Sequence, residues 1–245
     1  MNKSQKHVKT KNSKVRYPET LEDINQLVDL YRENKPIISS FYQLNKNYSG
    51  KELRKKAIGG NTFRAFHRKD KTSMGMSCYF ENTVVKYISE NPTSFEVQKR
   101  IISELKTETT GKFRNWGFDA NGEPKYWKLY NLYANYWVAN NLAGNLNSKI
   151  SSIKALKVPL DQYSLTFIRN LYNSSNTVSA FNLPKNLSMG SVRDMSHYES
   201  INSFIDKLAI EVNALLKAGE DEFFPIYLDI IQASKNNLDW YSRLI

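Results

Sequence analysis

Two carboxylates and a lysine stand close together in the middle of the sequence, at Asp119, Glu123 and Lys125. A carboxylate pair with a lysine can hold Mg²⁺ and activate water for phosphodiester cleavage. The trio surrounds Asn121-Gly122, and turns collect Asp, Gly and Pro for backbone reasons alone. We therefore keep a divergent metal-dependent nuclease only as the third hypothesis.

The other residues with ligating or nucleophilic side chains are scattered along the chain. His7, His67 and His197 do not pair with one another or with Cys78 at the spacing of a metal site. The pair Gly59-Gly60 lacks the lysine that follows in a phosphate-binding loop. We predict no catalytic residue, no metal and no cofactor, and expect a protein that is not an enzyme.

Positive charge is concentrated in the first third of the chain. Residues 1–74 hold 17 Lys and Arg against 7 Asp and Glu, whereas residues 75–245 hold 18 against 17. Basic residues at this density, without balancing acid, are typical of a surface that binds a polyanion. The predicted polyanion-binding residues are Lys3, Lys6, Lys9, Lys11, Lys14, Arg16, Lys51, Arg54, Lys55, Lys56, Arg64, Arg68, Lys69 and Lys71.

Two partners fit this charge, namely nucleic-acid phosphate and an acidic protein surface. The leading hypothesis is a non-enzymatic protein that binds nucleic acid through residues 1–74. In residues 194–245 there are 9 acidic residues against 4 basic ones, and we expect the C-terminal helices to self-associate into a homo-oligomer or larger assembly. The alternative is an assembly or scaffolding protein of a phage or mobile element that docks on an acidic lattice such as a capsid.

The composition indicates the cellular compartment of such a protein. No run of eighteen apolar residues occurs, so we expect no membrane span. The basic N-terminus has no apolar segment of the kind found in secretory signals. The single cysteine fits a reducing cytoplasm, or the host-cell cytoplasm if the chain is encoded by a phage.

Helices are the elements that the sequence predicts to carry these residues. The spacing of apolar residues predicts a mainly α fold, an irregular bundle of about eight helices with little or no β structure. We divide the chain into a flexible basic arm over 1–17 and helical parts over 18–112 and 113–245, or one continuous domain over both. Residues 76–88 fit either helix or strand.

Capping and breaking residues indicate where the first helices begin and end. Residues 18–34 predict a helix capped by Thr20, and Pro36 either ends that helix or starts the next one. Residues 49–58 predict a short basic helix that Gly59-Gly60 closes. This helix carries four of the predicted polyanion-binding residues.

An aromatic-rich segment predicts a helix from about Pro124 to about Ala143, closed by Gly144. Rings at a spacing of three and four residues pack against neighbouring helices more often than they stack on bases, and few basic residues accompany them here. We interpret them as core or as a protein–protein interface. The predicted interface residues are Tyr126, Tyr130, Tyr133, Trp137, Tyr227 and Tyr241.

The C-terminal part predicts a helical hairpin. Apolar residues recur at helical spacing from Ser196 until Gly219. The acidic run Glu220, Asp221 and Glu222 then suits the first turn of another helix, because the helix dipole favours negative charge there.

Overall fold

The computed structural model describes residues 20–44, 46–58, 128–142, 144, 146–174, 183, 187, 191–192 and 195–236. The predicted arm and the segment 59–127 lie outside them. Within this part the fold is helical and holds no strand, so the mainly α prediction is confirmed, with seven helices in place of about eight. They are α1 (Ile24–Gln43), α2 (Gly50–Ala57), α7 (Lys128–Asn140), α8 (Leu146–Lys154), α9 (Gln162–Ser174), α10 (Met195–Leu215) and α11 (Tyr227–Lys235).

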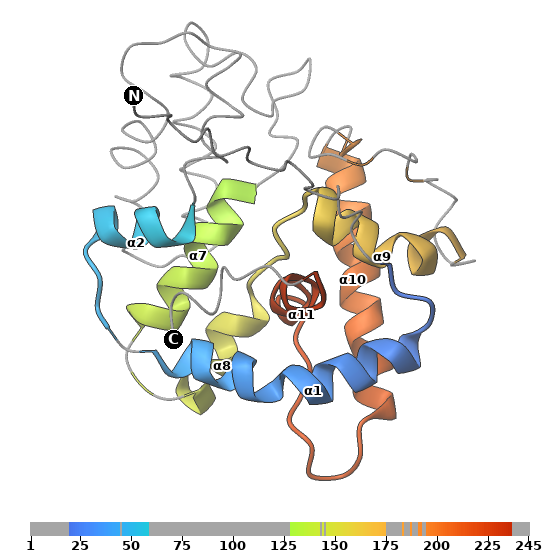
Figure 1. Ribbon diagram of the computed structural model, residues 1–245, viewed down its shortest axis with the longest axis horizontal. Helices are drawn as coiled ribbons and strands as arrows, with labels where there is room; N and C mark the ends of the chain where they lie inside the picture. Colours follow the sequence, from blue (N-terminus) through green and yellow to red (C-terminus); the bar gives the residue numbers. More distant parts are fainter. Residues whose placement is uncertain are drawn as a thin grey trace, which may run out of the picture.

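α11 lies at the centre of these helices. Figure 1 shows it end-on, with α1 running below it, α9 and α10 on one side and α7 and α8 on the other. All seven residues from Tyr227 to Ala233 are buried, as expected for a helix that is covered on every side. α11 packs against α1 and α9.

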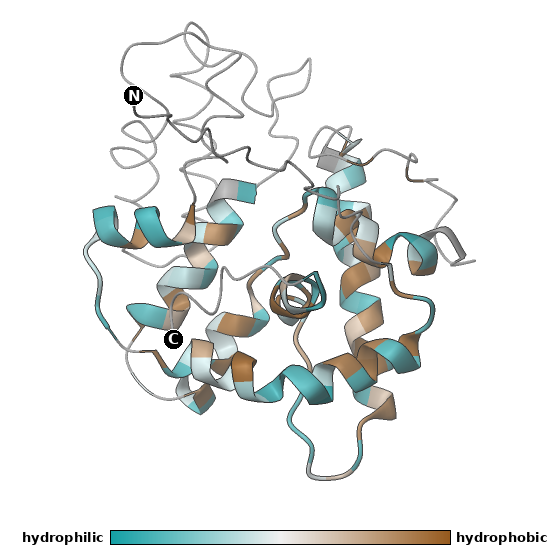
Figure 2. Ribbon diagram, in the orientation of Figure 1, coloured by the Kyte–Doolittle hydropathy of each residue, from teal (hydrophilic) through white to brown (hydrophobic). Residues whose placement is uncertain are grey.

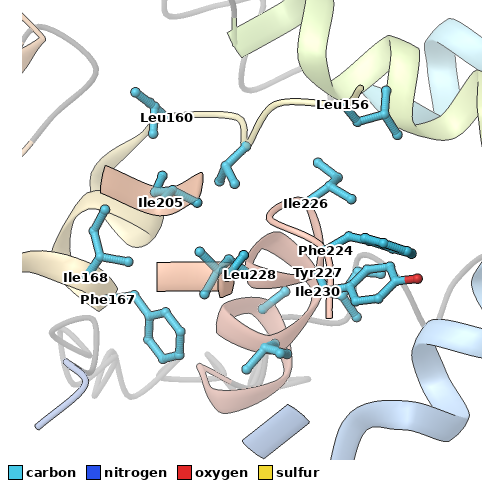
Figure 3. Close-up of a cluster of buried hydrophobic side chains, with 14 of the residues drawn as sticks. Leu156, Leu160, Phe167, Ile168, Ile205, Phe224, Ile226, Tyr227, Leu228 and Ile230 are labelled. Atoms are coloured by element: carbon cyan, nitrogen blue, oxygen red, sulfur yellow. The ribbon is translucent and has the colours of Figure 1, made fainter. Parts of the chain in front are cut away.

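The apolar core draws side chains from all seven described helices, and part of it lies between α9, α10 and α11. In Figure 3, Phe167 and Ile168 of α9, Ile205 of α10 and Leu228 of α11 lie toward one another. Each of them is at most 2% exposed. Full burial of a side chain of this kind stabilises a fold by about 1.5–3 kcal/mol, so this cluster is a main source of stability for the helical body.

α1 differs from the prediction at its start and at its proline. Its cap is Asp23, whose carboxylate accepts a hydrogen bond of 2.9 Å from the amide of Gln26, rather than Thr20. The helix also continues through Pro36. A proline inside a helix costs about 3 kcal/mol. The buried side chains beyond it, Ile38, Phe41 and Tyr42, offset that cost, since each contributes about 1.5–3 kcal/mol.

The predicted C-terminal hairpin is wrong. The acidic run 220–222 precedes α11 in an extended connection, and α11 begins only at Tyr227. Phe223 and Phe224 of that connection are buried, and the ring of Phe223 lies 5.2 Å from the ring of Tyr31 on α1. The connection is thereby held on α1, so α11 crosses the body instead of returning along α10 (Figure 1).

Gly144 lies in the turn between α7 and α8 rather than at the cap of α7, which ends at Asn140. Its φ of +105° is in the left-handed region that favours glycine. A Cβ atom added there would clash with Oγ of Ser148. This turn therefore requires a glycine for two separate reasons.

Candidate polyanion-binding surface

α2 presents three lysines on its exposed side. The helix packs against α7, and its buried residues are Leu53 and Ala57. Lys51, Lys55 and Lys56 are exposed. At about 100° per residue, Lys51 and Lys55 lie on the side opposite those two, whereas Lys56 lies on the flank of the helix. Figure 2 shows α2 as largely hydrophilic. We call these three lysines the basic face.

The one acidic residue of α2 is used by the helix itself. The amide and hydroxyl of Ser49 donate hydrogen bonds of 3.0 and 2.7 Å to the carboxylate of Glu52, and the amide of Glu52 donates to Oγ of Ser49 at 3.4 Å. This reciprocal cap satisfies the amides of Ser49 and Glu52 at the start of the helix. The hydrogen bonds from Ser49 also lower the pKa of Glu52, which is therefore ionised and offsets one of the three lysines.

The connection between α1 and α2 is fastened to the end of α7. The amide of Asn47 donates to the carbonyl of Asn140 at 2.9 Å, and Nδ2 of Asn141 donates to the carbonyl of Tyr48 at 2.6 Å. The ammonium of Lys56 lies 4.8 Å from the ring centroid of Tyr48, within the range of a cation–π contact. These contacts hold the basic face in a fixed place on the helical body.

The structure thus brings together three of the predicted polyanion-binding residues. A fourth, Arg54, is half-buried on the same helix. The remaining ones lie outside the described residues, and these are Lys3, Lys6, Lys9, Lys11, Lys14, Arg16, Arg64, Arg68, Lys69 and Lys71.

Three of the predicted interface tyrosines are buried inside the chain instead of lying at its surface. Tyr130, Tyr133 and Tyr227 are only 6%, 1% and 3% exposed within the chain itself. A buried side chain offers no surface to another protein, so the core alternative describes these three. Trp137 is half-buried on α7, and Tyr126 and Tyr241 lie outside the described residues.

The acidic residues 220–222, which we call the acidic clasp, are paired within the chain. Nε and Nη2 of Arg32 donate to the two carboxylate oxygens of Glu220, both at 2.9 Å. These bonds, together with one from the amide of Lys217, lower the pKa of Glu220 to about 2. The Tyr31 hydroxyl donates to the carbonyls of Asp221 and Glu222 at 2.9 and 3.2 Å. Two further ion pairs are Lys35–Asp221 at 3.1 Å and Lys154–Glu222 at 2.9 Å.

A buried lysine that the sequence analysis did not single out lies on α8. Lys149 is 0% exposed, and its ammonium donates to the carbonyls of Tyr42, Leu44 and Ala139 at 2.9, 3.2 and 2.8 Å. Burial lowers its pKa. All three of its donors are used inside the protein. A signal for this position exists in the sequence, because Lys149 falls on the same side of the helix as Ile153, four residues later.

The described part of the chain shows no site formed by the residues considered for catalysis. Asp119, Glu123 and Lys125 lie outside it. Within it, no three or more His, Cys, Asp or Glu side chains gather as they would around a metal ion, and no helix has the length and apolar character of a membrane span. A scan against family models, a search of curated proteins and a search of solved structures each gave no match to this chain.

Proposed function

We propose that the chain is a non-enzymatic polyanion-binding protein and that its polyanion is nucleic-acid phosphate. The observation that carries this proposal is the basic face, three exposed lysines on an eight-residue helix whose one acidic residue is hydrogen-bonded to the capping serine, Ser49. A lysine ammonium is a compact, strongly hydrated point charge that suits phosphate oxygens and reads no base edge. Binding should therefore depend on salt and not on base sequence.

The basic residues outside the described part enter the proposal through their charge alone. Residues 1–16 carry six Lys and Arg and no acid. Each additional phosphate contact would strengthen binding and steepen its dependence on salt. The basic face is the part of this surface whose contribution follows from geometry.

The ion pairs of the acidic clasp bear on the expected self-association of the C-terminal helices. Its three carboxylates are paired with Arg32, Lys35 and Lys154, and Asp206 of α10 is paired with Lys157 at 2.8 Å. Acidic groups that are already paired give little attraction to a second copy of the chain. Self-association therefore has no support from these groups, and native mass measured beside the binding assay tests it.

Fluorescence anisotropy tests the proposal directly. The probes are a labelled DNA duplex of about 20 base pairs and the matching single strand, titrated with the full chain between about 50 and 200 mM salt. We expect binding at low salt that weakens steeply as salt is added and does not change when the base sequence is scrambled. No binding at low salt would refute the proposal. Displacement of the duplex by polyglutamate at equal charge concentration would instead indicate an acidic protein as partner.

A further inference from the structure

We propose that Lys149 is a positioning residue for α2, and that its buried ammonium fixes the chain leaving α1 so that the basic face stands in one place. The effect of this role on binding rests on the proposed function, in which α2 binds a polyanion through the basic face. The role itself concerns the order of residues 46–58 and can be measured without any polyanion.

The three carbonyls that accept from Lys149 come from two helix ends. Tyr42 belongs to the last turn of α1, Leu44 is the residue that follows α1, and Ala139 belongs to the last turn of α7. Carbonyls in the last turn of a helix have no amide partner within the helix. The ammonium supplies that partner for both helices at one point.

The charge of Lys149 matches what these two ends require. Each helix C-terminus carries the equivalent of about −0.5 elementary charge. Two such ends meet around the buried side chain of Lys149, where without it they would repel each other and two of the three carbonyls would lack a hydrogen-bond donor in a buried place. One ammonium has a unit positive charge and three donors, so it neutralises both ends and satisfies three carbonyls. A neutral apolar side chain of the same length would do neither.

The same junction determines where α2 begins. The bond to Leu44 holds the first residue after α1, and Asn47 and Tyr48 are bound to Asn140 and Asn141 at the end of α7. Gly50 starts α2 directly after these contacts. Lys149 therefore joins α1 to α7 at the root of the connection that carries the basic face. With 0% exposure and all donors used, it has no capacity to contact a ligand itself.

The test uses Lys149→Met in the full chain, followed by hydrogen exchange with mass spectrometry. We expect exchange over residues 46–58 to become faster by about tenfold, because buried carbonyls lose their donors at the root of this segment. Exchange in α10 should change by less than about twofold, since α10 does not take part in the junction. Lys154→Met is the matched control, a lysine of the same helix paired with Glu222 at the surface, and it should leave 46–58 unchanged.

Each outcome decides the proposal. Unchanged exchange over 46–58 in Lys149→Met overturns it. Equal acceleration in all helices, or loss of the helical circular dichroism signal, also overturns it, because Lys149 would then support the whole fold and not α2 in particular. Faster exchange confined to 46–58 supports the positioning role. We then expect the affinity for the duplex to fall by about tenfold, because α2 must be ordered on binding. An unchanged affinity would refute the link between this role and the proposed function. A wild-type chain that binds no duplex refutes the proposed function but leaves the exchange result intact.

Discussion

Replacing the basic face with glutamine should reduce the salt dependence of nucleic-acid binding by a calculable amount. The variant is Lys51→Gln/Lys55→Gln/Lys56→Gln. Glutamine keeps good helix propensity, and the cap formed by Ser49 and Glu52 is untouched, so α2 should remain folded. The change therefore removes charge without removing the helix.

The magnitude follows from the number of exposed lysines. For duplex DNA, the slope of log Kobs against log salt is about −0.9 for each neutralised phosphate, so three lysines account for about −2.7. Between about 200 and 50 mM salt, a slope difference of that size widens the gap between wild type and variant by about 40-fold. Arg54 is half-buried and is not counted.

Anisotropy titrations across this salt range give the slope directly. A matched control is available on α10 and just after it, where Lys207 and Lys217 are also exposed. We compare Lys207→Gln/Lys217→Gln with Lys51→Gln/Lys55→Gln, which removes the same net charge. The α2 pair should reduce the slope by about 1.8, and the control pair should leave it nearly unchanged. Equal reductions in both pairs would refute a specific role for α2 and leave only the effect of overall charge.

Three further predictions concern stability and are measured by urea unfolding. The pKa of Glu220 is lowered from 4.5 to about 2 in the folded protein, so its contribution to the free energy of unfolding is complete above pH 4.5 and is lost as the pH falls toward 2. Glu220→Gln should therefore lose less stability than wild type between pH 4.5 and 2, and parallel pH profiles would contradict this. Tyr31→Phe should cost about 1 kcal/mol with an unchanged m value, because only the hydroxyl that holds the acidic clasp is lost, and no cost would show that the bond is not stabilising. Gly144→Ala should destabilise more than Gly219→Ala, since both have positive φ but only the first meets Ser148, and equal effects would exclude the clash.

Helices whose sequence carries strong helix-forming and helix-ending residues could be predicted from the sequence. α2 lies within the predicted range 49–58, where a basic run of helix-forming residues stands. α8 was not predicted because its sequence, LNSKISSIK, has a short apolar stripe among Ser, Asn and Lys, and its stability comes from packing. The hairpin was expected from the helical spacing of apolar residues up to Gly219 and from the acidic run that follows it. Burial of Phe223 and Phe224 in the connection directed α11 elsewhere.

The residues of the candidate surface could be predicted from the sequence, but the contacts between distant parts of the chain around it could not. The lysines of α2 were identified from charge density, and charge density is local. The pairing of Arg32 with Glu220 joins positions 188 residues apart, and no spacing rule connects them. The buried state of Tyr227 likewise depends on α1 and α9, which lie far from it along the sequence.

The central place of α11 has a consequence for how the chain folds during synthesis. The Tyr31 hydroxyl on α1 bonds to a carbonyl 190 residues later, just before α11. At about 5–20 residues per second, roughly 10 to 40 s pass between the synthesis of these two positions. For that time the apolar side of α1 has no α11 to cover it, so the nascent chain exposes apolar surface of the kind that promotes aggregation. Contacts of such long range also slow folding, so the described helical body should close late, after its last helix has left the ribosome.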